Sequence, residues 1–244
     1  MTYCLGIALE NGLVFCSDSR TNAGVDQVST YSKMHLFKTA EDRQFVLLSS
    51  GNLATTQAVV MKLKQDLQID APFNLNTART VDEAAEYIGE VSLKRQAKHT
   101  EAGQSSFDPK VTFIFGGQIR GAEPMLFLVY PEGNYITTSV DTPYLQIGES
   151  KYGKPILDRV IKPGTSIEDA AKCAIVSMDS TIRSNLSVGP PIELRVYEKD
   201  TFEPGRYLRF LEDDPYLRQV SRTWNQKLIE AYRTLPEISW GYQG

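Results

Sequence analysis

The chain has 244 residues, of which 41% are hydrophobic and 23% charged, enough for one domain with a full core. Its formal net charge of −4 argues against a nucleic acid or an acidic membrane as its partner, because both attract basic proteins. No apolar run approaches the ~18 residues of a membrane span and no basic, apolar leader opens the sequence, so we expect a cytoplasmic protein. Three cysteines and two histidines without ligand spacing indicate reduced core thiols, no metal and no cofactor.

The N-terminal segment has the pattern of a β-hairpin. Residues 3–9 and 13–18 read as two strands joined by the turn Glu10-Asn11-Gly12, whose Asn-Gly pair is a strong hairpin signal. Such a hairpin returns Asp18 to the start of the first strand, beside Thr2. Removal of Met1 would give Thr2 a free α-amine, whose ordinary pKa of about 7.7–8.0 leaves a neutral fraction able to take the hydroxyl proton. Threonine is common at this position, so Thr2 alone is a weak signal.

A short strand predicted at residues 33–37 begins with a lysine. If Lys33 lies between Asp18 and Thr2, it carries positive charge into the site and lowers the pKa of the hydroxyl and the amine. Asp18 would then keep the lysine charged and fix its direction. The alternative is an ordinary surface ion pair, which contributes little to stability. The candidate nucleophile beside the pair favours the catalytic interpretation.

The elements that follow alternate in groups of strands and helices. A strand at 45–49 leads into a Ser-Gly turn and a helix through 58–67, and Thr80 with Glu83 forms a capping box for a second helix. The remaining predicted elements are strands at 111–115, 125–130, 135–138 and 144–147, helices at 151–161 and 167–183, and strands at 192–197 and 206–210. This order is typical of two sheets packed face to face with helices outside.

The C-terminal tail predicts one more helix. Asp214 and Pro215 form its start, and apolar residues recur at three- and four-residue steps between Leu217 and Leu235. The apolar stripe fits packing on its own domain and packing on a neighbouring subunit equally well. We therefore assign residues 2–211 to the domain and 212–244 to a C-terminal helix and tail that extend it.

The positions of Thr2, Asp18, Lys33 and the segment Ser50-Gly51-x-x-Ala54-x-x-Gln57 resemble proteasome β-type subunits. These are N-terminal-nucleophile hydrolases of the threonine peptidase class. The chain length and the tail look most like the Anbu branch, the bacterial "ancestral β subunit". The resemblance implies an α+β fold, a four-layer αββα sandwich with a C-terminal helical extension.

The resemblance also implies the roles of the site residues and the partners. Thr2 matches the nucleophile, Asp18 and Lys33 the polarising pair, and Gly51 the glycine whose N–H helps to form the oxyanion hole, where a substrate carbonyl must approach the backbone. It implies a large homo-oligomer, a ring or an open spiral, that acts on peptides. The sequence leaves open whether an unfoldase works with it.

Two downstream segments depart from the family pattern. Glu149 occupies the position of an assisting serine, with Ser150 one residue later. Ser184 replaces the assisting aspartate, whereas Ser187 keeps a serine. These changes leave Thr2, Asp18 and Lys33 intact, but they put in question the strength and the pH dependence of any peptidase activity.

The expected pocket walls are small and polar, with Thr21 and Ser50 as substrate-binding residues and no strong charge. We therefore expect weak selectivity, for small or apolar side chains. The leading hypothesis is a self-compartmentalising threonine peptidase or amide hydrolase. The alternatives are a ring or filament scaffold with a vestigial site and a narrow-specificity, non-proteolytic amidase.

Overall fold

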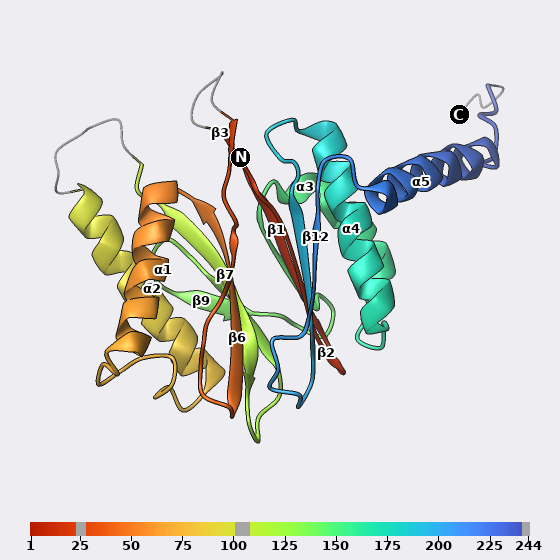
Figure 1. Cartoon of the computed structure of the whole chain (residues 1–244). Helices are drawn as coiled ribbons and strands as arrows, with labels where there is room; N and C mark the ends of the chain where they lie inside the picture. Colours follow the sequence, from red (N-terminus) through yellow and green to blue (C-terminus); the bar gives the residue numbers. More distant parts are fainter. Residues whose placement is uncertain (23–27, 101–107, 241–244) are drawn as a thin grey trace.

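Two β-sheets pack face to face at the centre of the molecule, and a pair of helices covers the outer face of each sheet (Figure 1). The computed structural model describes residues 1–22, 28–100 and 108–240. In these residues each sheet of the sandwich has five strands. The predicted αββα sandwich of the α+β class is confirmed.

The first sheet has the strand order β10-β1-β2-β11-β12, with all neighbours antiparallel. Its strands are β1 (Tyr3–Leu9), β2 (Gly12–Asp18), β10 (Tyr144–Gly148), β11 (Ile192–Glu198) and β12 (Arg206–Phe210). The second sheet has the order β5-β6-β7-β8-β9. Its strands are β5 (Met34–Leu36), β6 (Arg43–Gly51), β7 (Val111–Ile119), β8 (Met125–Val129) and β9 (Tyr135–Thr137). A separate two-stranded ribbon consists of β3 (Arg20–Asn22) and β4 (Val28–Thr30).

Helices complete the outer layers because their apolar faces need a sheet to cover them. The second sheet is covered by α1 (Leu53–Gln68) and α2 (Val81–Thr100), and the first sheet by α3 (Ser150–Val160) and α4 (Ile167–Ser184). Side chains alternate across each strand, so every sheet contributes to two cores. The core between the sheets contains Phe15, Ile114 and Tyr197, all buried.

The hairpin forms as predicted, but its turn is shifted by one residue. Leu9 pairs with Gly12, so Glu10 and Asn11 are the two turn residues and Gly12 already belongs to β2. Gly12 has φ +148°, and a Cβ there would lie 2.0 Å from the Tyr197 carbonyl oxygen. The glycine is therefore required by the close approach of β11 and not by the turn.

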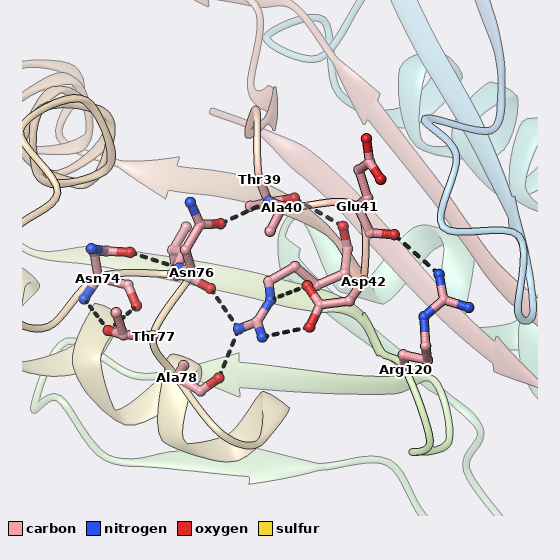
Figure 2. Close-up of polar contacts among 11 residues, drawn as sticks. Thr39, Ala40, Glu41, Asp42, Asn74, Asn76, Thr77, Ala78 and Arg120 are labelled. Atoms are coloured by element: carbon pink, nitrogen blue, oxygen red, sulfur yellow. Dashed lines mark hydrogen bonds and ion pairs between the residues drawn. The ribbon is translucent and has the colours of Figure 1, made fainter.

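The beginning of β6 is fixed by the buried Arg43, whose partners Asp42 and Ala78 are labelled in Figure 2. The Arg43 guanidinium pairs with Asp42 at 2.9 Å and donates to the carbonyls of Leu75 at 3.2 Å and Ala78 at 2.7 Å. Both carbonyls belong to the connection between α1 and α2. Arg43 thus ties this connection to the strand whose other end reaches the candidate site.

Local signals at the helix starts are largely confirmed. The Thr80 hydroxyl accepts a hydrogen bond from the Glu83 N–H at 3.2 Å, which caps α2. The Glu83 carboxylate accepts from the Arg79 N–H at 2.5 Å and not from that of Thr80, so the capping box is shifted by one residue. The sequence predicts Lys33 as the first residue of a strand over 33–37, whereas β5 begins at Met34, so Lys33 lies one residue before the strand.

The C-terminal helix α5 (Pro215–Arg233) begins as predicted, with Asp214 accepting from two backbone N–H groups of its first turn. Leu217 and Val220 are partly buried against the core under α4. Farther along, Leu228 is 50% and Tyr232 75% exposed. In Figure 1 the helix projects away from the sandwich. Its first half, as far as Asn225, contacts its own domain, where Arg183 of α4 donates to Ser221 and Asn225. No helix in the described part of the chain is long and apolar enough to cross a membrane.

Candidate active site

Asp18 lies at the end of β2 and is completely buried. Its Oδ1 accepts hydrogen bonds from the Tyr3 backbone N–H at 3.0 Å and from Lys33 Nζ at 2.6 Å, and its Oδ2 accepts from the Gly189 N–H at 3.4 Å. The first bond shows that the hairpin returns Asp18 to the start of β1, as its spacing predicts. The carboxylate therefore joins three segments of the chain: β1, the segment before β5 and the loop before β11.

Lys33 is 7% exposed, and its direction is set by two acceptors. Its Nζ donates to Asp18 and to the Arg20 carbonyl oxygen at 2.7 Å. An ammonium has three N–H donors, and among the described residues these two acceptors are its hydrogen-bond partners. Burial raises the pKa of Asp18, and the Lys33 ammonium opposes that rise. Asp18 and Lys33 therefore form a buried ion pair and not an ordinary surface ion pair.

Thr2 is held by its backbone against the start of α3. Its carbonyl oxygen accepts a hydrogen bond from the Glu149 N–H at 2.8 Å. Gly148 has φ +81°, and a Cβ there would lie 1.9 Å from the Thr2 carbonyl oxygen. Only glycine permits this approach without strain. Met1 precedes Thr2 and lines the same pocket.

A pocket of about 410 Å³ brings the predicted residues together. Of the residues expected in catalysis or substrate binding, it is lined by Thr2, Thr21, Lys33, Ser50 and Gly51. Asp18 does not line it, because it lies buried behind Lys33. These five residues come from four separate stretches of the chain, since Ser50 and Gly51 are adjacent.

Gly51 ends β6 with φ +107°. A Cβ there would lie 2.4 Å from the Lys110 carbonyl oxygen, so the residue must be glycine for reasons of backbone packing as well as any chemistry. The next residue, Asn52, caps α1 by accepting a hydrogen bond from the Thr55 N–H at 3.1 Å. The first turn of α1 has no acidic residue to offset its positive dipole end. Gly51 therefore lies where negative charge is favoured.

Glu149 touches Thr2 through its backbone. Its Oε2 is buried and has no hydrogen-bond partner among the described residues, and the nearest cation is Lys151 Nζ at 3.9 Å. Ser150 is the first residue of α3, and its carbonyl accepts a hydrogen bond from Gln146 Nε2 at 3.1 Å. Neither residue lines the pocket. The backbone N–H of Glu149 thus binds Thr2, whereas its carboxylate makes no hydrogen bond to Thr2.

Ser184 and Ser187 are not brought into the pocket. Ser184 is the exposed last residue of α4. Ser187 lies in the following loop, where its N–H donates to Asn185 Oδ1 at 2.9 Å. The same loop reaches the buried pair through the N–H of Gly189. In the described residues, the backbone of this loop and not its serines contacts Asp18.

The pocket also contains residues that sequence reasoning missed. They include His35, Ser49 and Arg20; Arg20 and the predicted Lys33 are both charged. The expectation of walls without strong charge is therefore wrong. The sequence pattern tests His35 only for the spacing of a metal ligand, which it lacks. Its position in β5, alternating with the inward-facing Met34, was the available signal.

The described residues contain no group of three or more His, Cys, Asp or Glu side chains placed to hold a metal ion. Cys4, Cys16 and Cys173 are buried free thiols. Burial raises the pKa of Cys173 to about 11, so this thiol is protonated at neutral pH. What the site offers chemically is a hydroxyl, a fixed ammonium and backbone donors.

Comparison with known proteins places this geometry in a family. Residues 2–197 match the family described as "Proteasome subunit". No protein of curated function matches the chain. The solved structures similar to it include Anbu (ancestral beta-subunit) from Yersinia bercovieri, with 43% identity, TM-score 0.91 and coverage of 97% of this chain and 99% of that one. Anbu from Hyphomicrobium sp. strain MC1 has 45% identity, TM-score 0.87 and coverage of 97% and 99%.

A third structure is described as a helical assembly of the Anbu complex from Pseudomonas aeruginosa. It has 42% identity and a TM-score of 0.92, and the alignment covers 99% of this chain and 100% of that one. The family match covers at least four strands of each sheet and the helices of both outer layers. The chain therefore belongs to the proteasome subunit family, with the N-terminal-nucleophile hydrolase fold, and is similar to Anbu over nearly its whole length.

Proposed function

We propose that the chain is a threonine-type N-terminal-nucleophile hydrolase that cleaves amide bonds in peptides after losing Met1. The observation that carries this proposal is the fixed ammonium of Lys33, held by Asp18 at 2.6 Å and by the Arg20 carbonyl at 2.7 Å in the pocket that Thr2 lines. A buried, directed cation beside a hydroxyl is an arrangement that activates a nucleophile.

The reaction would run in two balanced steps. The Thr2 hydroxyl oxygen attacks the carbonyl carbon, and the Thr2 α-amine accepts the hydroxyl proton. The C–N bond breaks, the leaving amine receives that proton, and an ester to Thr2 remains. Water then attacks the ester, its proton returns to the Thr2 oxygen, and the acid product leaves. The Gly51 N–H and the α1 dipole would stabilise the oxyanion of each step.

We also propose that the chain acts as a homo-oligomer. The Anbu from Pseudomonas aeruginosa is described as a helical assembly, and it matches 99% of this chain. The second half of α5 and the turn after it expose the apolar side chains of Leu228, Tyr232 and Leu235, each at least half exposed, and form a surface suited to a neighbouring subunit. Restricted access in such an assembly would limit hydrolysis to peptides that can enter.

The test uses two proteins from which Met1 has been removed, one with Thr2 and one with Thr2→Ala. Mass spectrometry first verifies the N-terminus of both. Only the Thr2 protein should turn over fluorogenic peptides and form a covalent adduct with an epoxyketone probe. An adduct in the Thr2→Ala protein contradicts the assignment of Thr2.

A scaffold with a vestigial site is the second candidate, because Glu149 stands at the position of an assisting serine and its carboxylate has no hydrogen-bond partner among the described residues. An assembled Thr2 protein that neither reacts with the probe nor cleaves any peptide would favour this second candidate.

A further inference from the structure

The pocket extends beyond Thr2 to a polar base formed by β5, β6 and α1. His35 pairs with Leu47 across the two strands, and Ser49 lies two residues beyond Leu47. Residues two apart in a strand lie on the same face, and Leu47 packs in the core under α1 and α2. His35 and Ser49 therefore face α1, whose Thr56 completes this part of the lining.

The His35 ring has hydrogen-bonding capacity to spare. Its Nε2 lies 3.4 Å from Ser49 Oγ, a long hydrogen bond, and Nδ1 has no hydrogen-bond partner in the described part of the chain. Burial, helped by the nearby charge of Lys64, lowers the pKa of His35 to about 4. The ring is therefore neutral at physiological pH and offers one donor and one acceptor.

The two cations in the pocket are already engaged. Lys33 is bound to Asp18 at 2.6 Å, and Arg20 donates to the Leu186 carbonyl at 2.9 Å and lies 3.6 Å from Glu212. A basic side chain entering the pocket would meet these like charges and, among the described residues that line it, no carboxylate. An apolar side chain would leave His35 Nδ1 without a hydrogen-bond partner, which costs binding energy.

We propose that this pocket recognises an uncharged hydrogen-bonding side chain, the carboxamide of glutamine or asparagine, through His35 and Ser49. A carboxamide carries both donors and an acceptor, the complement of a neutral imidazole and a hydroxyl. Taken with the proposed function, on which this point rests, the side chain belongs to the residue whose carbonyl Thr2 attacks. The preference replaces the small or apolar one expected from the sequence.

The test measures binding without catalysis. The Thr2→Ala protein is titrated calorimetrically with N-acetyl tripeptide amides that differ only in their last residue, which is glutamine, methionine, lysine or glutamate. Methionine has nearly the shape of glutamine without its hydrogen bonds. We expect glutamine to bind about tenfold more tightly than methionine, since it makes hydrogen bonds that methionine cannot.

The same titrations with His35→Phe added should reduce the preference to less than about threefold, because the ring keeps its bulk and loses its nitrogens. His35→Gln should retain most of it. His99→Phe, which changes the only other histidine of the sequence, is the matched control and should leave the preference intact.

Tightest binding of methionine, lysine or glutamate, no measurable binding of any peptide, or an unchanged preference in His35→Phe would overturn the proposal. Selective binding of glutamine by a protein whose Thr2 form hydrolyses nothing would leave this inference standing and refute the proposed function. Hydrolysis by the Thr2 protein without a preference for glutamine would support the proposed function and refute this inference.

Discussion

Replacing Lys33 by methionine tests whether the buried pair acts as one unit. The substitution keeps an unbranched chain of similar length and removes the ammonium. Asp18, which is completely buried, would retain only the N–H groups of Tyr3 at 3.0 Å and Gly189 at 3.4 Å. Lys33→Met therefore leaves a carboxylate without its counter-ion in the protein interior.

The structure sets the size of the effect. Breaking a buried pair by removing one partner costs about 3–5 kcal/mol, whereas replacing both partners by neutral groups is often nearly neutral. We expect Lys33→Met to lower the free energy of unfolding by about 3–5 kcal/mol at neutral pH. Adding Asp18→Asn should recover about 2 kcal/mol or more of that loss, since the uncompensated charge is gone.

The pH dependence of this loss has a definite sign. Burial raises the pKa of Asp18 in the folded protein, and without Lys33 the rise is larger. The folded state then binds more protons than the unfolded state between the unfolded pKa of about 3.9 and the raised value. Stability lost in Lys33→Met should therefore increase as the pH rises through this interval and shrink on acidification.

Urea unfolding of the wild type, both single variants and the double variant at neutral and acidic pH measures these terms. Peptide turnover by the same proteins, each freed of Met1, should fall severely in each single variant and little further in the double variant. A loss below about 1 kcal/mol in Lys33→Met, or losses that simply add, would refute the buried unit.

Four further results are expected. Glu149→Ser should move the acidic limb of the kcat/KM profile to lower pH, because the carboxylate belongs to the residue whose N–H binds the Thr2 carbonyl and its charge would raise the pKa of the Thr2 amine; an unmoved limb would show that the carboxylate does not act on the amine. Arg43→Met should cost about 2–4 kcal/mol in urea unfolding, since two buried carbonyls lose their donor. Truncation before Pro215 should reduce particle size in light scattering, and an unchanged particle restricts α5 to internal packing. The pKa of His35 falls from 6.5 in the unfolded chain to about 4 in the folded protein, so the unfolded state binds more protons between these values. The free energy of unfolding of the wild type should therefore decrease as the pH is lowered from 6.5 to about 4, by about 3 kcal/mol more than that of His35→Gln.

Several features of this protein follow from short stretches of sequence. The alternation around Asn11 predicts the hairpin, and the hairpin alone brings Asp18 to the N–H of Tyr3. The caps at Thr80 and Asp214 begin their helices as predicted. These elements depend on contacts between residues close in the chain, so local propensity and periodicity suffice to predict them. The order of the elements then predicts the layers of the fold.

Other features arise only when distant segments meet. The carbonyl oxygen of Tyr197 lies so close to Gly12 that no side chain fits there, and no local pattern in the sequence reveals that contact. His35 and Ser49 become the polar base of one pocket because β5 pairs with β6 in a particular register beneath α1. Whether a residue such as Glu149 faces Thr2 by its backbone or by its side chain is likewise set by the packing of α3. The sequence alone predicted which residues near the N-terminus come together as a candidate site. Only the tertiary structure decided which walls enclose it, because strand register and long-range packing depend on the whole chain at once.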